Sequence, residues 1–246
     1  MDTLTRVREV PPSAAPARRA TSSGRTFRQF LHENGLTLVL MGLFLISWIG
    51  QTVTGWVEHN KDNAEHNQPQ VTMTHYLASG HFWQATAENW ESEFLQMAMF
   101  VLLTVCLRQK GSPESKGIDG EEEVDADPLE KRDDPRAPWP VRQGGAILWV
   151  YSHSLSIAFA LLFIMSFVLH AWGGAVSYSE QQHVHGEHGA SVLQYMATSR
   201  FWFESFQNWQ SEFLSLAAMV YLAVYLRERG SAESKPVATP HDEQGA

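Results

Sequence analysis

Two long uncharged stretches constrain the fold of this chain more than any other feature. Asn34 to Val57 is an uncharged run of 24 residues, and Gln143 to Ser179 also contains no Asp, Glu, Lys or Arg. A helix rises about 1.5 Å per residue, so about 20 residues cross a hydrocarbon core roughly 30 Å thick. We therefore predict a membrane-spanning helix in each stretch, the apolar part of the second being Ala146 to Trp172.

Two shorter apolar runs predict two further spanning helices. Phe94–Leu107 and Phe213–Leu226 have 14 residues each, which span only about 21 Å and would also suit a buried helix of a soluble protein. Each run ends at an arginine and follows an aromatic stretch typical of a membrane–water interface. We therefore expect helices over about 82–108 and 201–227. Their expected interface anchors are Trp83, Trp90, Trp202 and Trp209.

The distribution of Lys and Arg predicts how the chain is oriented. The segments around the four apolar runs hold six, one, seven, one and three of the 18 basic residues, in chain order. By the positive-inside rule, both termini and the central linker lie in the cytoplasm, as in a bacterial inner-membrane protein. The first run is too long for a cleaved signal peptide. A net charge of −9 argues against a nucleic-acid partner, and a single Cys excludes a Cys-rich metal site.

The chain matches itself without a gap when it is shifted by 119 residues. Asn89-Trp90 falls on Asn208-Trp209, and Glu114-Ser115-Lys116 falls on Glu233-Ser234-Lys235. Each copy is a helical hairpin that begins and ends on the same side, so we predict an all-α four-helix membrane bundle of two parallel repeats. The expected parts are a disordered tail (1–26), a first hairpin (27–110), a charged linker (111–142), a second hairpin (143–230) and a disordered tail (231–246).

Several of these stretches resemble a known family. FRQFLHENGLTLVLMGLFLISWIGQTVTGW, HFWQATAENWESEFLQM and the second copy RFWFESFQNWQSEFL are similar to bacterial four-pass membrane proteins that are catalogued only as a domain of unknown function. The similarity covers about residues 27–235. It implies the membrane location and the duplicated hairpin, and it supplies no activity, substrate or catalytic residue.

A layer of polar residues inside the predicted membrane region is the sharpest candidate site. Glu93 precedes Arg108 by 15 residues, hence by about 22 Å of helix, and Glu212 has the same relation to Arg227. A carboxylate at that depth must be paired, protonated or hydrated. The same reasoning gives a layer of Gln51, Asn89, Glu93, His170, Asn208 and Glu212. The layer is interpreted as a proton, cation or small-molecule site, or alternatively as hydrogen bonds that lock the bundle.

Metal binding is a weaker expectation, and no cofactor is predicted outright. His170 with two carboxylates would suit a divalent ion, but the Glu-x-x-His pattern of helical-bundle metal sites is missing, since Gln96 and Ser215 stand three residues after the two glutamates. The loops predicted to lie outside are rich in histidine. A metal site there would use His66, His183, His185 and His188, although polar loops with several histidines are usually just solvated.

Three classes of function remain open. The chain carries no phosphate-binding Gly loop, G-x-S-x-G or H-E-x-x-H motif, so we expect a non-enzymatic membrane component or accessory subunit. Its partners would be the lipid bilayer and a second copy or another membrane protein. The alternatives are a small proton, cation or solute transporter element that uses Glu93 and Glu212, and an extracytoplasmic metal-binding protein that uses the loop histidines.

Overall fold

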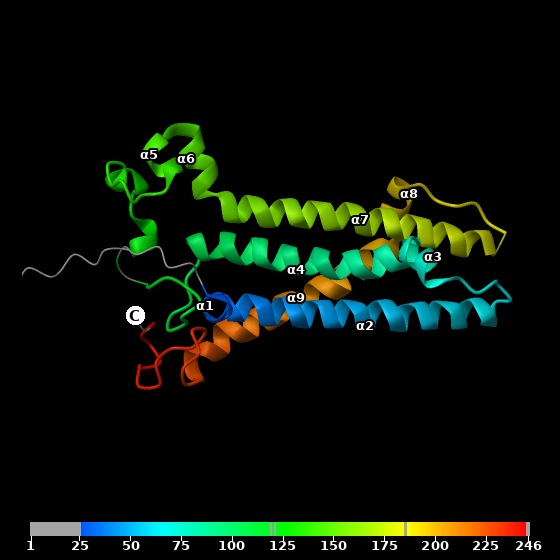
Figure 1. The fold of residues 1–246 in the computed structure, drawn as a ribbon, viewed down its shortest axis with the longest axis horizontal. Helices are drawn as coiled ribbons and strands as arrows, with labels where there is room; N and C mark the ends of the chain where they lie inside the picture. Colours follow the sequence, from blue (N-terminus) through cyan, green and yellow to red (C-terminus); the bar gives the residue numbers. More distant parts are fainter. Residues whose placement is uncertain (1–25, 119, 121, 185, 245–246) are drawn as a thin grey trace, which may run out of the picture. The chain divides into compact units, whose positions relative to one another are not determined.

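The computed structural model describes residues 26–244 except 119, 121 and 185, and these residues form an all-α fold without strands, as predicted (Figure 1). The helices are α1 (Phe27–Glu33), α2 (Gly35–Glu65), α3 (Met73–Leu77), α4 (Gly80–Cys106), η1 (Glu123–Asp125), η2 (Pro128–Lys131), α5 (Trp139–Gln143), α6 (Gly145–Ser152), α7 (Ser154–Val184), α8 (Val192–Met196) and α9 (Ser199–Tyr225). The chain divides into two compact units, residues 1–51 and 52–246. Nearly all of the tail expected over 1–26 lies outside the described residues.

The N-terminal unit consists of α1 and the first part of α2. The Thr26 hydroxyl caps α1 by accepting a hydrogen bond from the backbone N–H of Gln29. Asn34 ends the helix, and its side-chain amide donates to the carbonyl of Phe30 at 2.9 Å. A side chain that bonds the preceding turn competes with the helical ladder, which explains the break before α2.

Two helices meet the length and composition criteria for crossing a membrane. They are α2 and α7, with mean hydropathies of 1.9 and 2.1 over an 18-residue window. The other two helices predicted to span, α4 and α9, are not among them. The reason is in the sequence: their charge-free parts have only 14 residues each, and glutamates precede them.

The C-terminal unit is organised around α4, which packs along α7 and contacts α9 (Figure 1). Two glycines permit the close approach of α4 and α7. A Cβ on Gly173 would lie 2.6 Å from the backbone nitrogen of Gln84, and one on Gly80 would lie 2.6 Å from the carbonyl oxygen of Gly173. Small residues at such a crossing let two helix backbones touch. The helices α4 and α9 are joined through Gln96, whose amide donates to the carbonyl of Glu212 and the hydroxyl of Ser215.

The element bounds repeat along the chain. Helices α7, α8 and α9 begin and end 119 residues after α2, α3 and α4. Local details recur at the same offset. Ser79 and Thr198 cap α4 and α9, and Gly111 and Gly230 have φ of 83° and 88°. Equivalent sequences therefore adopt equivalent local structures in both halves.

The segments after α4 and α9 also carry matching contacts. The Ser115 hydroxyl accepts from the backbone of Gln109, and Ser234 does the same for Glu228. The tail expected to be disordered over 231–246 makes hydrogen bonds in its described part. Buried Lys235 donates to three backbone carbonyls of residues 240–243, and Gln244 donates to the carbonyl of Lys116.

Candidate metal centre

Three glutamates and a histidine meet between α4, α7 and α9. Glu88 and Glu91 are three residues apart on α4 and so share one face of that helix. His170 lies on α7 and Glu204 on α9. The side chains of His170 and Glu91 are 0% and 1% exposed, while Glu88 and Glu204 are 24% and 17% exposed. The group is therefore closed around the histidine and open toward the two outer carboxylates.

The carboxylate of Glu91 contacts one ring nitrogen of His170. His170 Nδ1 is 2.7 Å from Glu91 Oε2, and the indole N–H of Trp209 donates to Glu91 Oε1 at 2.9 Å. The ring of Phe201 stacks on the imidazole with 4.8 Å between centroids. Both oxygens of this buried carboxylate thus have a partner, and the histidine ring has little freedom to turn.

The second nitrogen of the ring faces the other two carboxylates. His170 Nε2 is 3.4 Å from Glu204 Oε2 and 3.9 Å from Glu88 Oε2. One ligand atom each from Glu88, His170 and Glu204 lies within 4.8 Å of the others. Ligand atoms of a tetrahedral site are about 3.3 Å apart for metal–ligand distances of about 2.0 Å. Side-chain adjustments on the order of 1 Å would close the three around an ion, so this group could hold a metal.

Glu204 is fixed by two further side chains. The hydroxyl of Tyr195 on α8 donates to Glu204 Oε2 at 2.5 Å, and Arg200 Nε donates to Glu204 Oε1 at 3.0 Å. Burial and the Glu204 carboxylate together raise the pKa of Tyr195, which keeps its proton for this bond. Arg200 also donates to Gln181 Oε1 at 2.6 Å, which links the group to the end of α7.

The polar layer expected from the sequence is divided among different places. His170 belongs to the group just described, whereas Glu93 is exposed and Glu212 half-buried, beside the α4–α9 contact that Gln96 makes. Asn89 and Asn208 bond carbonyls four residues earlier on their own helices, those of Ala85 and Glu204. Gln51 belongs to the N-terminal unit, so its place in a shared layer stays a prediction.

The sequence interpretation missed Glu88, Glu91 and Glu204. One signal was available: Glu88 and Glu91 have the i, i+3 spacing of residues on one helix face. Among the expected interface anchors, Trp209 donates its indole N–H to Glu91 of the group. Trp83 and Trp90 are half-buried, and Trp202 is exposed.

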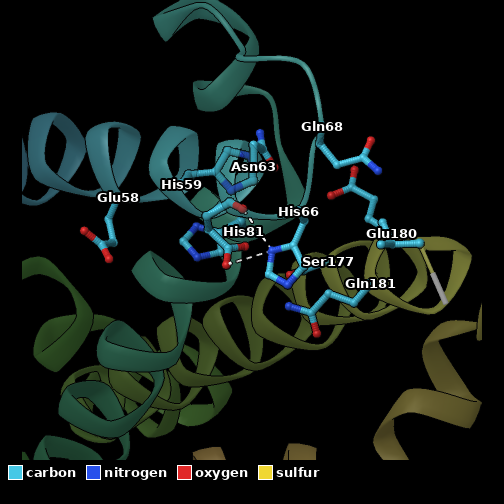
Figure 2. A pocket seen from close by; sticks show the side chains of 11 residues that line it. Glu58, His59, Asn63, His66, Gln68, His81, Ser177, Glu180 and Gln181 are labelled. Atoms are coloured by element: carbon cyan, nitrogen blue, oxygen red, sulfur yellow. Dashed lines mark hydrogen bonds and ion pairs between the residues drawn. The ribbon is translucent and has the colours of Figure 1, made fainter.

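The expected loop site is only partly described. His66 lines a pocket of about 410 Å³ together with His59 and His81 (Figure 2). His183 lies beside Gly189, and His188 is exposed. His185 falls outside the described residues.

Comparison with known proteins gives a family and no activity. No curated protein and no solved structure matches the chain. A family model described as "Domain of unknown function (DUF6766)" matches residues 27–246, which covers all four long helices. The chain therefore belongs to this family of unknown function.

Proposed function

We propose that this protein is an integral membrane protein that binds a divalent transition-metal ion through Glu88, His170 and Glu204. One observation carries the proposal. His170 Nδ1 lies 2.7 Å from Glu91 Oε2, and His170 Nε2 faces two further carboxylates. A histidine that binds a metal through one ring nitrogen typically donates a hydrogen bond from the other ring N–H to a carboxylate. This bond sets the tautomer and the orientation of the ring.

The donor set indicates which ions would fit. One imidazole nitrogen and two carboxylates suit Zn²⁺, Mn²⁺, Fe²⁺ or Co²⁺, whereas Mg²⁺ and Ca²⁺ are usually held by oxygen alone. Three protein ligands leave at least one coordination position for water. The proposal assigns metal binding to a membrane component and does not require a catalytic step.

The membrane part of the proposal rests on charge and length. In it, α2, α4, α7 and α9 cross the inner membrane as two duplicated hairpins with both termini in the cytoplasm. Support comes from the two long apolar helices, the alternation of basic segments and the 119-residue offset of the element bounds. Glu88 precedes Arg108 by 20 residues, or about 30 Å of helix, so the group would lie near the extracytoplasmic surface.

A proton is the competing occupant of the group. A doubly protonated His170 would donate to Glu91 and Glu204, and the network would be complete as a buried ion pair. The two alternatives differ in a measurable way. A metal must displace the Nε2 proton, so binding should release protons and strengthen as the pH rises.

The test is metal stoichiometry of the full chain in lipid nanodiscs. We expect about one Zn²⁺ or Co²⁺ per chain at the group after dialysis, lost in the Glu88→Gln/Glu204→Gln variant. The matched control is Glu93→Gln/Glu212→Gln, which makes the same change on the same two helices. A metal stoichiometry that is unchanged in the first variant would overturn the proposal. Loss of cation flux in the control variant alone would instead support the transporter alternative.

A further inference from the structure

An apolar groove lies between α4 and α9, toward the C-terminal ends of the two helices. The helices are joined through Gln96, and beyond this contact a pocket of about 330 Å³ opens between them. Each helix lines the groove with one apolar face, because its side chains recur at positions i, i+3 and i+7. These side chains are Phe100, Leu103 and Leu107 of α4 and Phe213, Leu216 and Val220 of α9. Sites for organic ligands are mostly apolar and enclose roughly 300–1,000 Å³, so the groove suits the hydrocarbon part of such a ligand.

The proposed topology places this groove in the cytoplasmic half of the membrane. Its apolar side chains belong to the uncharged runs Phe94–Leu107 and Phe213–Leu226. Phe100 precedes Arg108 by eight residues, or about 12 Å of helix, which is less than half of the hydrocarbon thickness. The acyl chains of lipids are therefore the apolar groups that the groove would meet. To this extent the inference rests on the membrane part of the proposed function.

The groove ends at two residues of opposite charge, Arg108 and Glu114. Arg108 donates through Nη1 to the carbonyls of Val105 and Leu107, which are neutral acceptors and do not compensate its charge. Burial raises the pKa of Glu114, and the carboxylate of Glu233 raises it further. A cationic group beside Glu114 would favour its ionised form. This end of the groove thus offers a cation to an anionic group and a carboxylate to an ammonium group.

We infer that the groove between α4 and α9 is a binding site for a glycerophospholipid with an ethanolamine head group. One acyl chain lies between the two apolar faces, the phosphate meets Arg108, and the ammonium group meets Glu114. A phosphatidylglycerol has the same phosphate but no ammonium group, so its negative charge would face Glu114 and Glu233 without compensation. Selectivity for the head group therefore separates this site from the general coating of a membrane protein by lipid.

The experiment is a lipid titration of the full chain in detergent, followed by native mass spectrometry. The probes are phosphatidylethanolamine and phosphatidylglycerol with identical acyl chains. We expect the wild type to bind the first about tenfold more tightly than the second. Glu114→Gln should remove this preference, and Arg108→Gln should weaken the binding of both lipids by about tenfold. The matched controls are Glu228→Gln and Arg229→Gln, which change exposed residues that do not line the groove.

A second variant tests the acyl chain independently of the head group. Ala217 lines the groove, so Ala217→Phe places a ring in the space assigned to the chain. We expect this variant to bind both lipids about tenfold more weakly, since an occupied space can accept no further methylene groups without strain. Leu214→Phe is the control, because Leu214 is exposed on α9 and does not line the groove.

Equal affinity of the wild type for the two lipids would overturn the inference, and so would an unchanged preference in Glu114→Gln. A dimer that binds neither lipid would also overturn it, because a second copy would then occupy the groove. Metal binding is measured separately and can fail without affecting this result. Release of the chain from membranes by alkaline carbonate would overturn the membrane part of the proposed function together with this inference. A chain that stays in the membrane without a lipid preference would overturn this inference alone.

Discussion

Trp209 and Glu91 show how much a single side chain contributes to the buried group. The indole N–H is the donor to Glu91 Oε1, and a buried acceptor that loses its donor costs about 1–3 kcal/mol. We expect Trp209→Phe to lower the free energy of unfolding by that amount. Denaturant unfolding in detergent, followed by circular dichroism, measures it. Trp202→Phe changes a partly exposed ring on the same helix and is the control. Equal losses in the two variants would contradict this role of Trp209.

Arg200 opposes any cation that approaches Glu204. Its charge lies about 3 Å from a carboxylate that we assign as a ligand, and two like charges 4 Å apart repel by about 4 kcal/mol at an effective dielectric of 20. We expect Arg200→Gln to tighten metal binding at the buried group by about tenfold or more. Competition against a chelator of known affinity gives the change. Arg229→Gln, on an exposed arginine, should leave the affinity unaltered, and a weaker Arg200→Gln site would refute the argument.

The sequence analysis named His170 as a candidate but did not name the carboxylates that surround it. Counting residues from a charged boundary gives the position along a helix axis, and by this measure Glu91 and Glu93 differ by only about 3 Å. Two residues also turn the helix by about 200°, which sends their side chains to opposite faces. The structure buries Glu91 against His170 and leaves Glu93 exposed. Which face of α4 meets α7 depends on packing, and that information is not local in the sequence.

At the scale of elements, the contact between α4 and α7 depends on glycine. A Cβ at Gly173 would meet backbone atoms of α4 at 2.6–3.1 Å, and backbone cannot move aside cheaply. We expect Gly173→Ala to cost about 1–3 kcal/mol of stability. Gly42→Ala is the matched control, because, apart from its chain neighbours and the nearby backbone of its own helix, no described atom lies within 4 Å of its Cβ position. Alanine within a helix gains about 0.5–1 kcal/mol relative to glycine. Thermal unfolding in detergent compares the two. A neutral Gly173→Ala would show that the helices separate freely.

Hydropathy predicted the number of long helices and their approximate extent, but it did not predict the residues at which they begin and end. The expected helices over 82–108 and 201–227 correspond to α4 (Gly80–Cys106) and α9 (Ser199–Tyr225). Ser79 and Thr198 set the starts by capping, a local signal that the hydropathy argument did not use. The break between α6 and α7 occurs at His153, whose Nδ1 lies 2.8 Å from the carbonyl oxygen of Trp149. Such side-chain bonds to the preceding turn do not show in apolar periodicity.

The segments after α4 and α9 make the stability of the fold depend on pH. Partial burial raises the pKa of Glu114, and the nearby Glu233 carboxylate raises it further. A carboxyl whose folded pKa is raised penalises the fold when ionised, and the penalty disappears as the pH falls through that pKa. We therefore expect the wild type to gain stability relative to Glu114→Gln as the pH falls from neutral toward the ordinary pKa of a glutamate. Melting temperatures of both proteins across this range test the sign. A difference that grows in the other direction would contradict it.

At the scale of the whole molecule, the proposed topology places the two polar loops outside and the linker inside. The single native Cys makes this simple to test. On a Cys106→Ser background, Gln68→Cys and Glu187→Cys should react with a membrane-impermeant maleimide in intact cells. Glu130→Cys should react only after permeabilisation. Labelling of all three in intact cells would refute the four-span arrangement. Labelling of Glu130→Cys alone in intact cells would show that the orientation is the opposite of the proposed one.

The buried group takes its members from both halves of the chain, and this has a consequence for how such a protein could arise. Glu88 and Glu91 come from the first half, and His170 and Glu204 from the second. Positions 119 residues away from these four carry Gln207, Gln210, Gln51 and Ala85. A single ancestral hairpin that paired with its own copy would have carried the same residue at both equivalent positions. Under the proposed duplication, the asymmetry of the present group therefore arose after the two copies were joined in one gene, when each could diverge without changing the other.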